Sequence, residues 1–248
     1  MLGVSAPTVR RDLERLEADG MLRRVHGGAY LPGVGDATAS AGAYLPGAAN
    51  ATASADDNPA EAPFAAMMDD HAADKELVAR AAAGLVEPGQ VVLLDIGTTT
   101  MRIARYLRGR NITVITASIA VLDVLRDDEQ TALVLLGGTL RRNYQSLVGP
   151  LTEDALGAVS ADVAVLTCTG IRPDGSVVDD ITAEATVKRA IVRSASRVVL
   201  AAPASKFPGS GSLRICRLDD LDDLVTTAAA DPVTLQRGRE AGMNVTIA

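Results

Sequence analysis

The sequence is poor in aromatic residues and in cysteine, and each scarcity excludes a class of protein. Aromatic residues make up 2% of the 248 positions, with no tryptophan, so a core must be built from aliphatic side chains. The two cysteines, Cys168 and Cys216, are far apart and have no histidine near them. They predict neither a disulfide framework nor a metal site, so we expect buried, unreactive thiols and no bound metal.

Long apolar runs and an excess of positive charge are absent as well. No apolar run reaches the roughly 18 residues that a membrane-spanning helix needs, and the start of the chain does not have the pattern of a signal peptide. The formal net charge is −7, so nucleic acid could bind only to a local basic patch. These features predict a cytoplasmic protein that does not associate with a membrane.

Three segments of the chain differ in composition. Residues 1–30 are rich in arginine and have the pattern of a short helix followed by two strands. Residues 31–70 are mostly small or polar, and the stretch 28–41 is repeated with few changes at 42–55. Two short copies are too few for a solenoid, so we interpret 31–70 as a flexible linker. The open alternative is a binding motif presented twice through its tyrosine.

The third segment, residues 71–248, alternates between strand and helix patterns. Continuous aliphatic runs predict strands at 91–95, 112–116, 132–136, 163–166, 198–201, 224–226 and 245–247. Helices are predicted at 74–86, 98–108, 118–127, 150–158, 180–195 and 232–241. This alternation is typical of an α/β domain with a mostly parallel, Rossmann-like sheet and helices on both faces. In such a sheet, ligands bind at the carboxyl ends of the strands.

The N-terminal segment gathers polar and basic residues. Val9, Leu13 and Leu16 form one apolar stripe on the predicted helix, and the arginines lie off that stripe. A helix of this kind followed by a basic strand pair is typical of a domain that places the helix in the major groove of DNA. The candidate DNA-binding residues are Ser5, Thr8, Arg10, Arg11, Arg15, Arg23, Arg24 and His26. The alternative is an ordinary solvated helix, because nearby acidic residues almost cancel the arginines.

The residues after the first predicted strand of the third segment form a candidate anion site. Gly97 permits a tight turn, and Thr98 to Thr100 place hydroxyls beside the free N–H groups of a helix start, an arrangement that suits phosphate. Ordinary capping by threonine would explain the same residues. The turn is neither a dinucleotide fingerprint nor a Walker motif, so we expect no NAD or ATP cofactor.

Other charged side chains follow other predicted strands. Arg141 and Lys206 each come shortly after a strand, and the chain has only three lysines, of which Lys188 and Lys206 fall near this predicted rim. Glu184 and Lys188 are spaced i, i+4 on a predicted helix. For that pair, a surface ion pair is the simple explanation.

The N-terminal segment resembles the recognition helix and wing of the DeoR family of bacterial transcription repressors. The resemblance lies in Thr8-Val9-Arg10-Arg11-Asp12-Leu13 and His26-Gly27-Gly28-Ala29, and it implies binding to operator DNA. Family members carry a further helix and the first helix of the motif before this point. We therefore expect 1–30 to be a partial winged helix-turn-helix, with weak or absent specific DNA binding if the chain truly starts at Met1.

Residues 72–248 resemble the sensor domain of the same family. The matching blocks are Asp95-Ile96-Gly97-Thr98-Thr99, Gly137-Gly138-Thr139-Leu140-Arg141, Asp174-Gly175-Ser176, Glu184-Ala185-Thr186-Val187-Lys188-Arg189-Ala190 and Ser205-Lys206-Phe207. That domain is similar in fold to ribose-5-phosphate isomerase and the CoA transferases, binds a phosphorylated sugar or polyol, and typically forms oligomers. The resemblance implies that 71–248 is a sugar-phosphate sensor and oligomerisation domain.

The resemblance also implies roles for particular residues. Asp95 would hold sugar hydroxyls and the Gly97 turn the phosphate, while Glu184 and Lys188 would line the sugar. The full candidate set for ligand binding is Asp95, Gly97, Thr98, Thr99, Gly138, Arg141, Glu184, Lys188 and Lys206. Two positions depart from the family pattern, because Pro203 stands where the family usually has aspartate and Ala117 where it usually has asparagine. These departures leave the identity of the ligand, and ligand binding itself, open.

The sequence therefore predicts a repressor of a carbohydrate-metabolism operon, controlled by a phosphorylated sugar or polyol and assembled as a homo-oligomer. Two alternatives stay open. One is an effector-binding protein without specific DNA binding. The other is a sugar-phosphate isomerase that uses Asp95 and Glu184 as acid and base. Such an enzyme would have no use for the arginine-rich helix and wing, and fold alone does not imply function, so we do not expect an enzyme.

Overall fold

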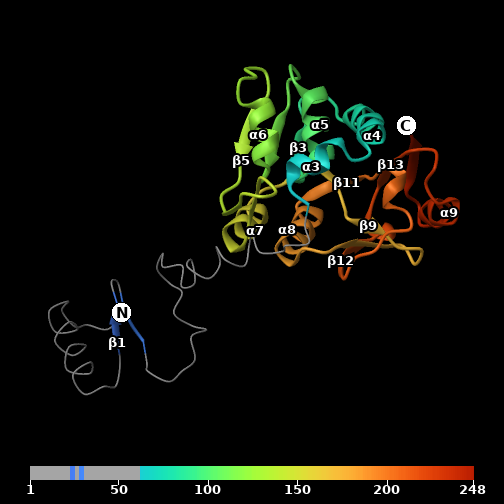
Figure 1. Cartoon of the computed structure of the whole chain (residues 1–248). Coiled ribbons are helices and arrows are strands. Elements are labelled where there is room, and N and C mark those ends of the chain that lie inside the picture. Colours follow the sequence, from blue (N-terminus) through green and yellow to red (C-terminus); the bar gives the residue numbers. More distant parts are fainter. Residues whose placement is uncertain (1–22, 26–27, 31–61) are drawn as a thin grey trace. The chain divides into compact units, whose positions relative to one another are not determined.

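The computed structural model describes residues 23–25, 28–30 and 62–248, which belong to two compact units, Met1–Ala48 and Ala49–Ala248 (Figure 1). In the first unit, strand β1 (Arg23–Val25) pairs antiparallel with β2 (Gly28–Tyr30). This hairpin agrees with the predicted strand pair. The candidate DNA-binding residues that lie outside the described residues are Ser5, Thr8, Arg10, Arg11, Arg15 and His26.

A sheet of seven parallel strands forms the centre of the second unit. The strand order is β14-β13-β11-β8-β3-β4-β5, and every neighbouring pair is parallel. The strands are β3 (Val91–Leu94), β4 (Thr113–Thr116), β5 (Ala132–Leu135), β8 (Ala161–Leu166), β11 (Ala195–Ala201), β13 (Asp223–Thr226) and β14 (Asn244–Ile247). The predicted mostly parallel α/β sheet is confirmed.

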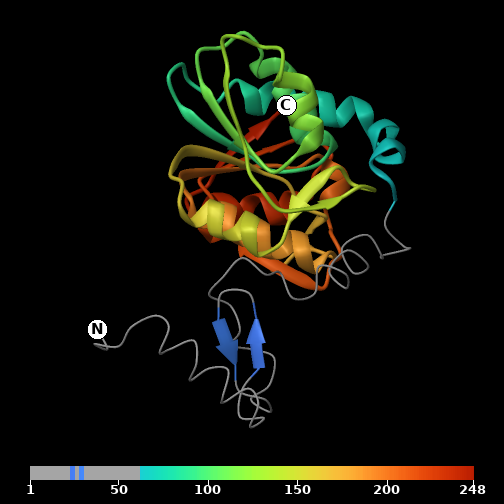
Figure 2. The same ribbon diagram turned by 90° about the vertical axis from the view of Figure 1, so that its left-hand side faces the viewer.

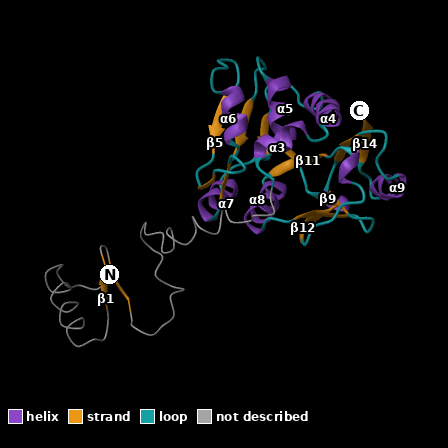
Figure 3. Ribbon diagram, in the orientation of Figure 1, coloured by secondary structure: helices purple, strands orange, loops and turns teal. Residues whose placement is uncertain are grey.

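Helices cover both faces of this sheet (Figures 2 and 3). The helices are α4 (Ala72–Ala83), α5 (Thr98–Leu107), α6 (Ile119–Leu125), α7 (Pro150–Gly157), α8 (Thr182–Arg193) and α9 (Pro232–Glu240). Successive strand residues point to opposite faces. Val92 and Leu94 therefore pack with residues of α4, α5 and α6, while Leu93 packs with residues of α7, α8 and α9. The clusters on both faces are mainly aliphatic, as the scarcity of aromatic residues predicts.

Shorter strands add two small antiparallel sheets that the sequence analysis did not predict. They are β6 (Thr139–Arg141) with β7 (Ser146–Val148), and β12 (Leu213–Arg217), β10 (Ser176–Asp179) and β9 (Gly170–Ile171) in that order. Two single-turn helices, η1 (Ala204–Lys206) and η2 (Leu218–Asp220), flank β12 in the chain. Strands of two to five residues are too short to show a clear alternation of apolar and polar residues.

A helix also lies within the range interpreted as a linker. Helix α3 spans Phe64–Asp69, and the Phe64 side chain is buried. Its ring meets the Tyr144 ring edge to face, with ring centroids 5.9 Å apart. One aromatic anchor therefore fixes a segment that composition alone indicated to be without structure.

The order in which successive strands are added to the sheet changes direction between β3 and β8. From β3 the strands continue through β4 to β5, whereas from β8 they continue on the opposite side through β11 and β13 to β14. The connections after β3 and β8 therefore diverge, and a crevice between such connections is the general ligand site of open α/β sheets. Among the residues that the structure describes, no helix is long and apolar enough to span a membrane.

Candidate functional site

A pocket of about 470 Å³ opens at the carboxyl ends of β3 and β8. Ile96 follows β3 and Thr167 follows β8, and both line the pocket. Three of the candidate ligand-binding residues also line it, namely Glu184, Lys188 and Lys206. The pocket therefore lies at the position that the strand order favours.

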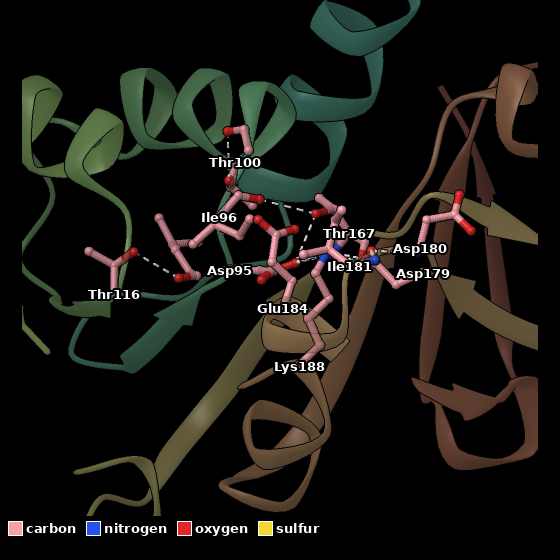
Figure 4. Close-up of polar contacts among 12 residues, drawn as sticks. Asp95, Ile96, Thr100, Thr116, Thr167, Asp179, Asp180, Ile181, Glu184 and Lys188 are labelled. Atoms are coloured by element: carbon pink, nitrogen blue, oxygen red, sulfur yellow. Dashed lines mark hydrogen bonds and ion pairs between the residues drawn. The ribbon is translucent and has the colours of Figure 1, made fainter. Parts of the chain in front are cut away.

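Lys188 is the buried centre of charge beside this pocket (Figure 4). Its ammonium lies 3.2 Å from Asp95 Oδ2 and 3.1 Å from Asp179 Oδ2, and it donates to the Thr167 carbonyl oxygen at 3.1 Å. Burial alone would lower the pKa of Lys188, but Asp95, Asp179 and Glu184 together raise it well above the ordinary lysine value. An ammonium has three N–H donors, and all three have protein acceptors, so Lys188 mainly positions the two aspartates.

Asp95 is fully buried and is not among the residues that line the pocket. Its Oδ2 accepts hydrogen bonds from the Thr167 N–H at 2.9 Å and the Thr167 hydroxyl at 2.8 Å. Within the described part of the chain, Asp95 Oδ1 has no hydrogen-bond partner. The contact of Asp95 with sugar hydroxyls stays a prediction, and in the structure the carboxylate joins the end of β3 to α8 and to the end of β8.

Asp179, at the end of β10, was missed by the sequence analysis. It lines the pocket, and its Oδ1 accepts from the N–H groups of Asp180 and Ile181 at 2.8 and 3.1 Å. Burial acts to raise the pKa of Asp179, but Lys188 and these backbone donors outweigh it and hold the pKa below its ordinary value. The acidic pair Asp179–Asp180 at the start of a predicted helix was the available signal.

Glu184 and Lys188 do not form the surface ion pair that their spacing allowed. Both side chains are buried, at 5% and 3% exposure. Glu184 pairs with Arg141, which comes from the distant strand β6, while Lys188 pairs with Asp95 and Asp179. Tertiary neighbours have therefore replaced the local i, i+4 interaction.

Arg141 and Gly138 lie away from the pocket wall. Arg141 is 1% exposed, and its guanidinium pairs with Glu184 and lies 5.7 Å from the centre of the Tyr144 ring. We expected this cation to face the ligand, whereas the structure places it behind Glu184. A Cβ on Gly138 would collide with the Thr152 hydroxyl, so this glycine permits close packing of the chain.

The Gly97 turn has the geometry that its sequence predicts. Gly97 caps α5 with φ 110° and ψ 174°, a combination that essentially only glycine adopts. Thr98 and Thr99 occupy the first turn of α5, where backbone N–H groups have no partner within the helix. Their side chains are buried and are not on the pocket wall. The anion site at this turn stays a prediction.

Lys206 differs from the other cations of the site. It belongs to η1, after β11, and its side chain is half-buried on the pocket wall. Within the described residues, its ammonium forms no hydrogen bond or ion pair. Pro203 accepts a hydrogen bond from the Lys206 N–H at 2.9 Å. Pro203 and Ala117 are both buried off the pocket wall.

Cys168 also lines the pocket, directly after Thr167. Burial raises the pKa of its thiol to about 12, and burial raises that of Cys216 to about 12 as well. Both thiols are therefore protonated at neutral pH, and the prediction of unreactive thiols agrees with their surroundings. No group of histidine, cysteine and acidic side chains in the described ranges is arranged to hold a metal ion.

Comparison with known proteins places the chain in a family. The model of the DeoR C terminal sensor domain matches residues 70–228, and the model of the DeoR-like helix-turn-helix domain matches residues 1–33. The chain is 30% identical to the HTH-type transcriptional repressor GlcR of Bacillus subtilis over 226 residues, which cover 91% of this chain and 78% of that protein. It is 30% identical to the L-fucose operon activator of Escherichia coli, covering 91% and 84%.

Further similarities are weaker. The chain is 28% identical to the glycerol-3-phosphate regulon repressor of Escherichia coli, covering 94% of this chain and 83% of that protein. Among solved structures, ribose 5-phosphate isomerase A of Methanocaldococcus jannaschii is similar over 51% of this chain and 50% of that chain, with 18% identity and a TM-score of 0.38. The matched domains and the curated relatives together show that the chain belongs to the DeoR family of transcriptional regulators.

Proposed function

We propose that the chain regulates transcription of a carbohydrate-metabolism operon and that a phosphorylated sugar or polyol, bound in the pocket between β3 and β8, controls it. The observation that carries the proposal is Lys206, a half-buried ammonium on the pocket wall without a counter-ion among the described residues. A bound anion would supply that counter-ion, and a phosphate would gain charge-assisted hydrogen bonds.

The rest of the wall supports a ligand that carries hydroxyl groups as well as an anion. Asp179, Asp180 and Glu184 line the pocket, and carboxylates are acceptors for hydroxyl donors. The first turn of α5, directly after Ile96, supplies a second place where an anion is favoured. The names of two relatives refer to L-fucose and to glycerol 3-phosphate, in line with this class of ligand.

The geometry disfavours an isomerase. A general base must come within hydrogen-bond reach of the proton that it removes. Asp95 is fully buried against Lys188 and Thr167, and Glu184 is paired with Arg141. Glu184 lines the pocket, but both carboxylates are engaged by buried cations, so we propose a sensor and not an isomerase.

The DNA-binding part of the proposal rests on residues 1–33, which match the helix-turn-helix domain of the family. The candidate contacts are Ser5, Thr8, Arg10, Arg11, Arg15, Arg23, Arg24 and His26. An effector changes DNA binding only if it binds the two states of the protein with different affinity. An inducer must therefore favour the state with low affinity for operator DNA.

The exposed edge of the sheet supports a homo-oligomer. Strand β5 pairs with β4, and no other strand in the described part of the chain covers its outer edge. Val134 and Leu135 on this strand are 43% and 39% exposed, and the strand has no charged residue or proline. Such an edge is a template for pairing with another chain, and a second copy is the partner that the family resemblance indicates.

The first test is the melting temperature of the full chain with a panel of phosphorylated sugars and polyols, each beside its unphosphorylated counterpart. A ligand at one hundred times its dissociation constant stabilises the folded state by about 2.7 kcal/mol, a shift that is easily measured. A shift with one phosphorylated compound supports the sensor. Conversion of that compound to an isomer would instead support the enzyme, and no shift with any compound would contradict the proposed ligand class.

A further inference from the structure

Helix α3 supplies a wall of the pocket from outside the matched sensor domain. Ala62, just before the helix, and Met67, within it, both line the pocket. The sensor model begins at residue 70 and the helix-turn-helix model ends at residue 33. Residues 62–69, which lie between the two matched domains in the chain, therefore reach the place where we propose that the effector binds.

Contacts at both ends hold α3 against the sensor. At its start, the Phe64 ring packs on Tyr144, another residue of the pocket wall, and the Phe64 N–H donates to the Asn143 carbonyl oxygen at 3.0 Å. At its end, two cationic side chains donate hydrogen bonds to carbonyl oxygens of the last turn. Lys75 donates to Met67 at 2.7 Å, and Arg102 donates to Met68 at 2.6 Å.

Lys75 also lies close enough to Lys206, a residue of the pocket wall, for their charges to repel each other. Burial lowers the pKa of Lys75, Asp70 acts in the opposite direction, and repulsion from Lys206 and Arg102 lowers it further. Lys75 and Arg102 contact the last turn of α3, and Lys206 lines the same pocket as Met67. An anion bound at Lys206 would offset this repulsion, because opposite charges within a few ångströms favour each other's charged forms.

We propose that α3 is an effector-contacting wall of the pocket, and that a bound phosphorylated ligand holds it in its docked position by contacting both Met67 and Lys206, which line the pocket. This inference rests on the proposed function. Helix α3 lies between the two matched domains in the chain, and its docking then depends on the ligand. Met67 is then a ligand-binding residue that the motifs of the sensor do not contain.

Hydrogen exchange of the full chain tests the docking. The probes are glucose 6-phosphate, glycerol 3-phosphate and inorganic phosphate, with glucose and glycerol as controls. The Met67 N–H donates to the Pro63 carbonyl oxygen at 3.1 Å, so its exchange reports on α3 directly. We expect a probe that raises the melting temperature to slow the exchange of α3 amides about tenfold, the factor that corresponds to 1.4 kcal/mol.

The hydrogen exchange of the amides in the Gly97 turn and in η1 shows whether a failure concerns the inference or the proposed function. Slower exchange there with unchanged exchange in α3 would mean that the ligand binds while α3 does not respond, which overturns the inference and leaves the proposed function standing. If neither these probes nor any other phosphorylated compound of the panel alters exchange or melting temperature anywhere, the proposed function fails and the inference fails with it.

A matched pair of variants tests the contact itself. Met67 and Met68 are neighbours on α3 and both are half-buried, but only Met67 lines the pocket. We expect Met67→Ala to raise the dissociation constant of the bound probe about tenfold, and Met68→Ala to raise it less. Equal dissociation constants for the wild type and Met67→Ala, measured by calorimetry, would overturn the contact.

Discussion

The ammonium of Lys188 lies 3.2 Å from Asp95 Oδ2, and this buried ion pair fastens α8 to the end of β3. Asp95 and Lys188 are far apart in the sequence, and each has less than 4% of its surface exposed. The pair lies directly beside the crevice where the connections after β3 and β8 diverge. The shape of the pocket therefore depends on a charge pair that the solvent does not reach.

Replacing Lys188 by methionine should destabilise the fold strongly. The change leaves the carboxylates of Asp95 and Asp179 buried without their common cation, and loss of one partner from a buried ion pair costs about 3–5 kcal/mol. The free energy of unfolding, measured in urea near neutral pH, should fall by about this amount. A loss below about 1 kcal/mol would show that the pair contributes only as an exposed pair does.

The pH dependence of the same variant has a definite sign. In the wild type, the pKa of Asp179 is held below its ordinary value, so its contribution to stability is present above the unfolded pKa and is lost as the pH falls through the folded pKa. Without Lys188, burial would raise the folded pKa of Asp179. The deficit of Lys188→Met relative to the wild type should therefore grow as the pH rises from about 4 to neutral, and unfolding curves at a series of pH values measure it.

Lys206→Met should remove ligand binding while leaving the fold intact. The ammonium has no hydrogen bond or ion pair among the described residues, so its loss should change the free energy of unfolding by no more than about 0.5 kcal/mol. The melting-temperature shift with the phosphorylated ligand should disappear. Arg105→Met, which removes an exposed cation of α5, is the matched control and should keep the shift. A full shift in Lys206→Met would contradict the placement of the phosphate.

Gly97→Ala should destabilise the protein and weaken ligand binding together. At φ 110° and ψ 174° an alanine is strained by about 1–3 kcal/mol, and the strain falls on the turn that begins α5. Gly157→Ala is the control, since a Cβ there meets nothing within 4 Å and its φ is not in the left-handed region. Urea unfolding and ligand titration of both variants measure the effect, and equal behaviour of the two would be evidence against a specific role for the turn.

Val134→Lys should dissociate the proposed oligomer. A charged side chain on the exposed strand β5 blocks pairing with another sheet edge, and Val134 is 43% exposed, so the monomer should keep its fold. Light scattering after size-exclusion chromatography gives the mass of each form. The equivalent change at Val233, 66% exposed on α9, is the control. An unchanged mass in Val134→Lys would place the interface elsewhere.

Much of the fold followed from local sequence patterns. The aliphatic runs of the strands predicted at 91–95 and 163–166 lie in the neighbouring central strands β3 and β8, because a strand buried on both faces needs apolar side chains along its length. The Gly97 turn was recognisable too, because its backbone conformation is a local property. The linker interpretation, in contrast, did not anticipate α3, whose position depends on a contact between Phe64 and Tyr144.

The sequence by itself determined the alternation of strands and helices, the parallel sheet and the strand ends at which a ligand site should lie. Only the tertiary structure decided which charges reach the pocket. It buried Arg141 behind Glu184, bound all three donors of Lys188, enclosed Asp95, and left Lys206 on the wall. The physical reason is that the energy of a buried charge depends on the partners that distant segments bring to it, and spacing along the chain does not specify those partners.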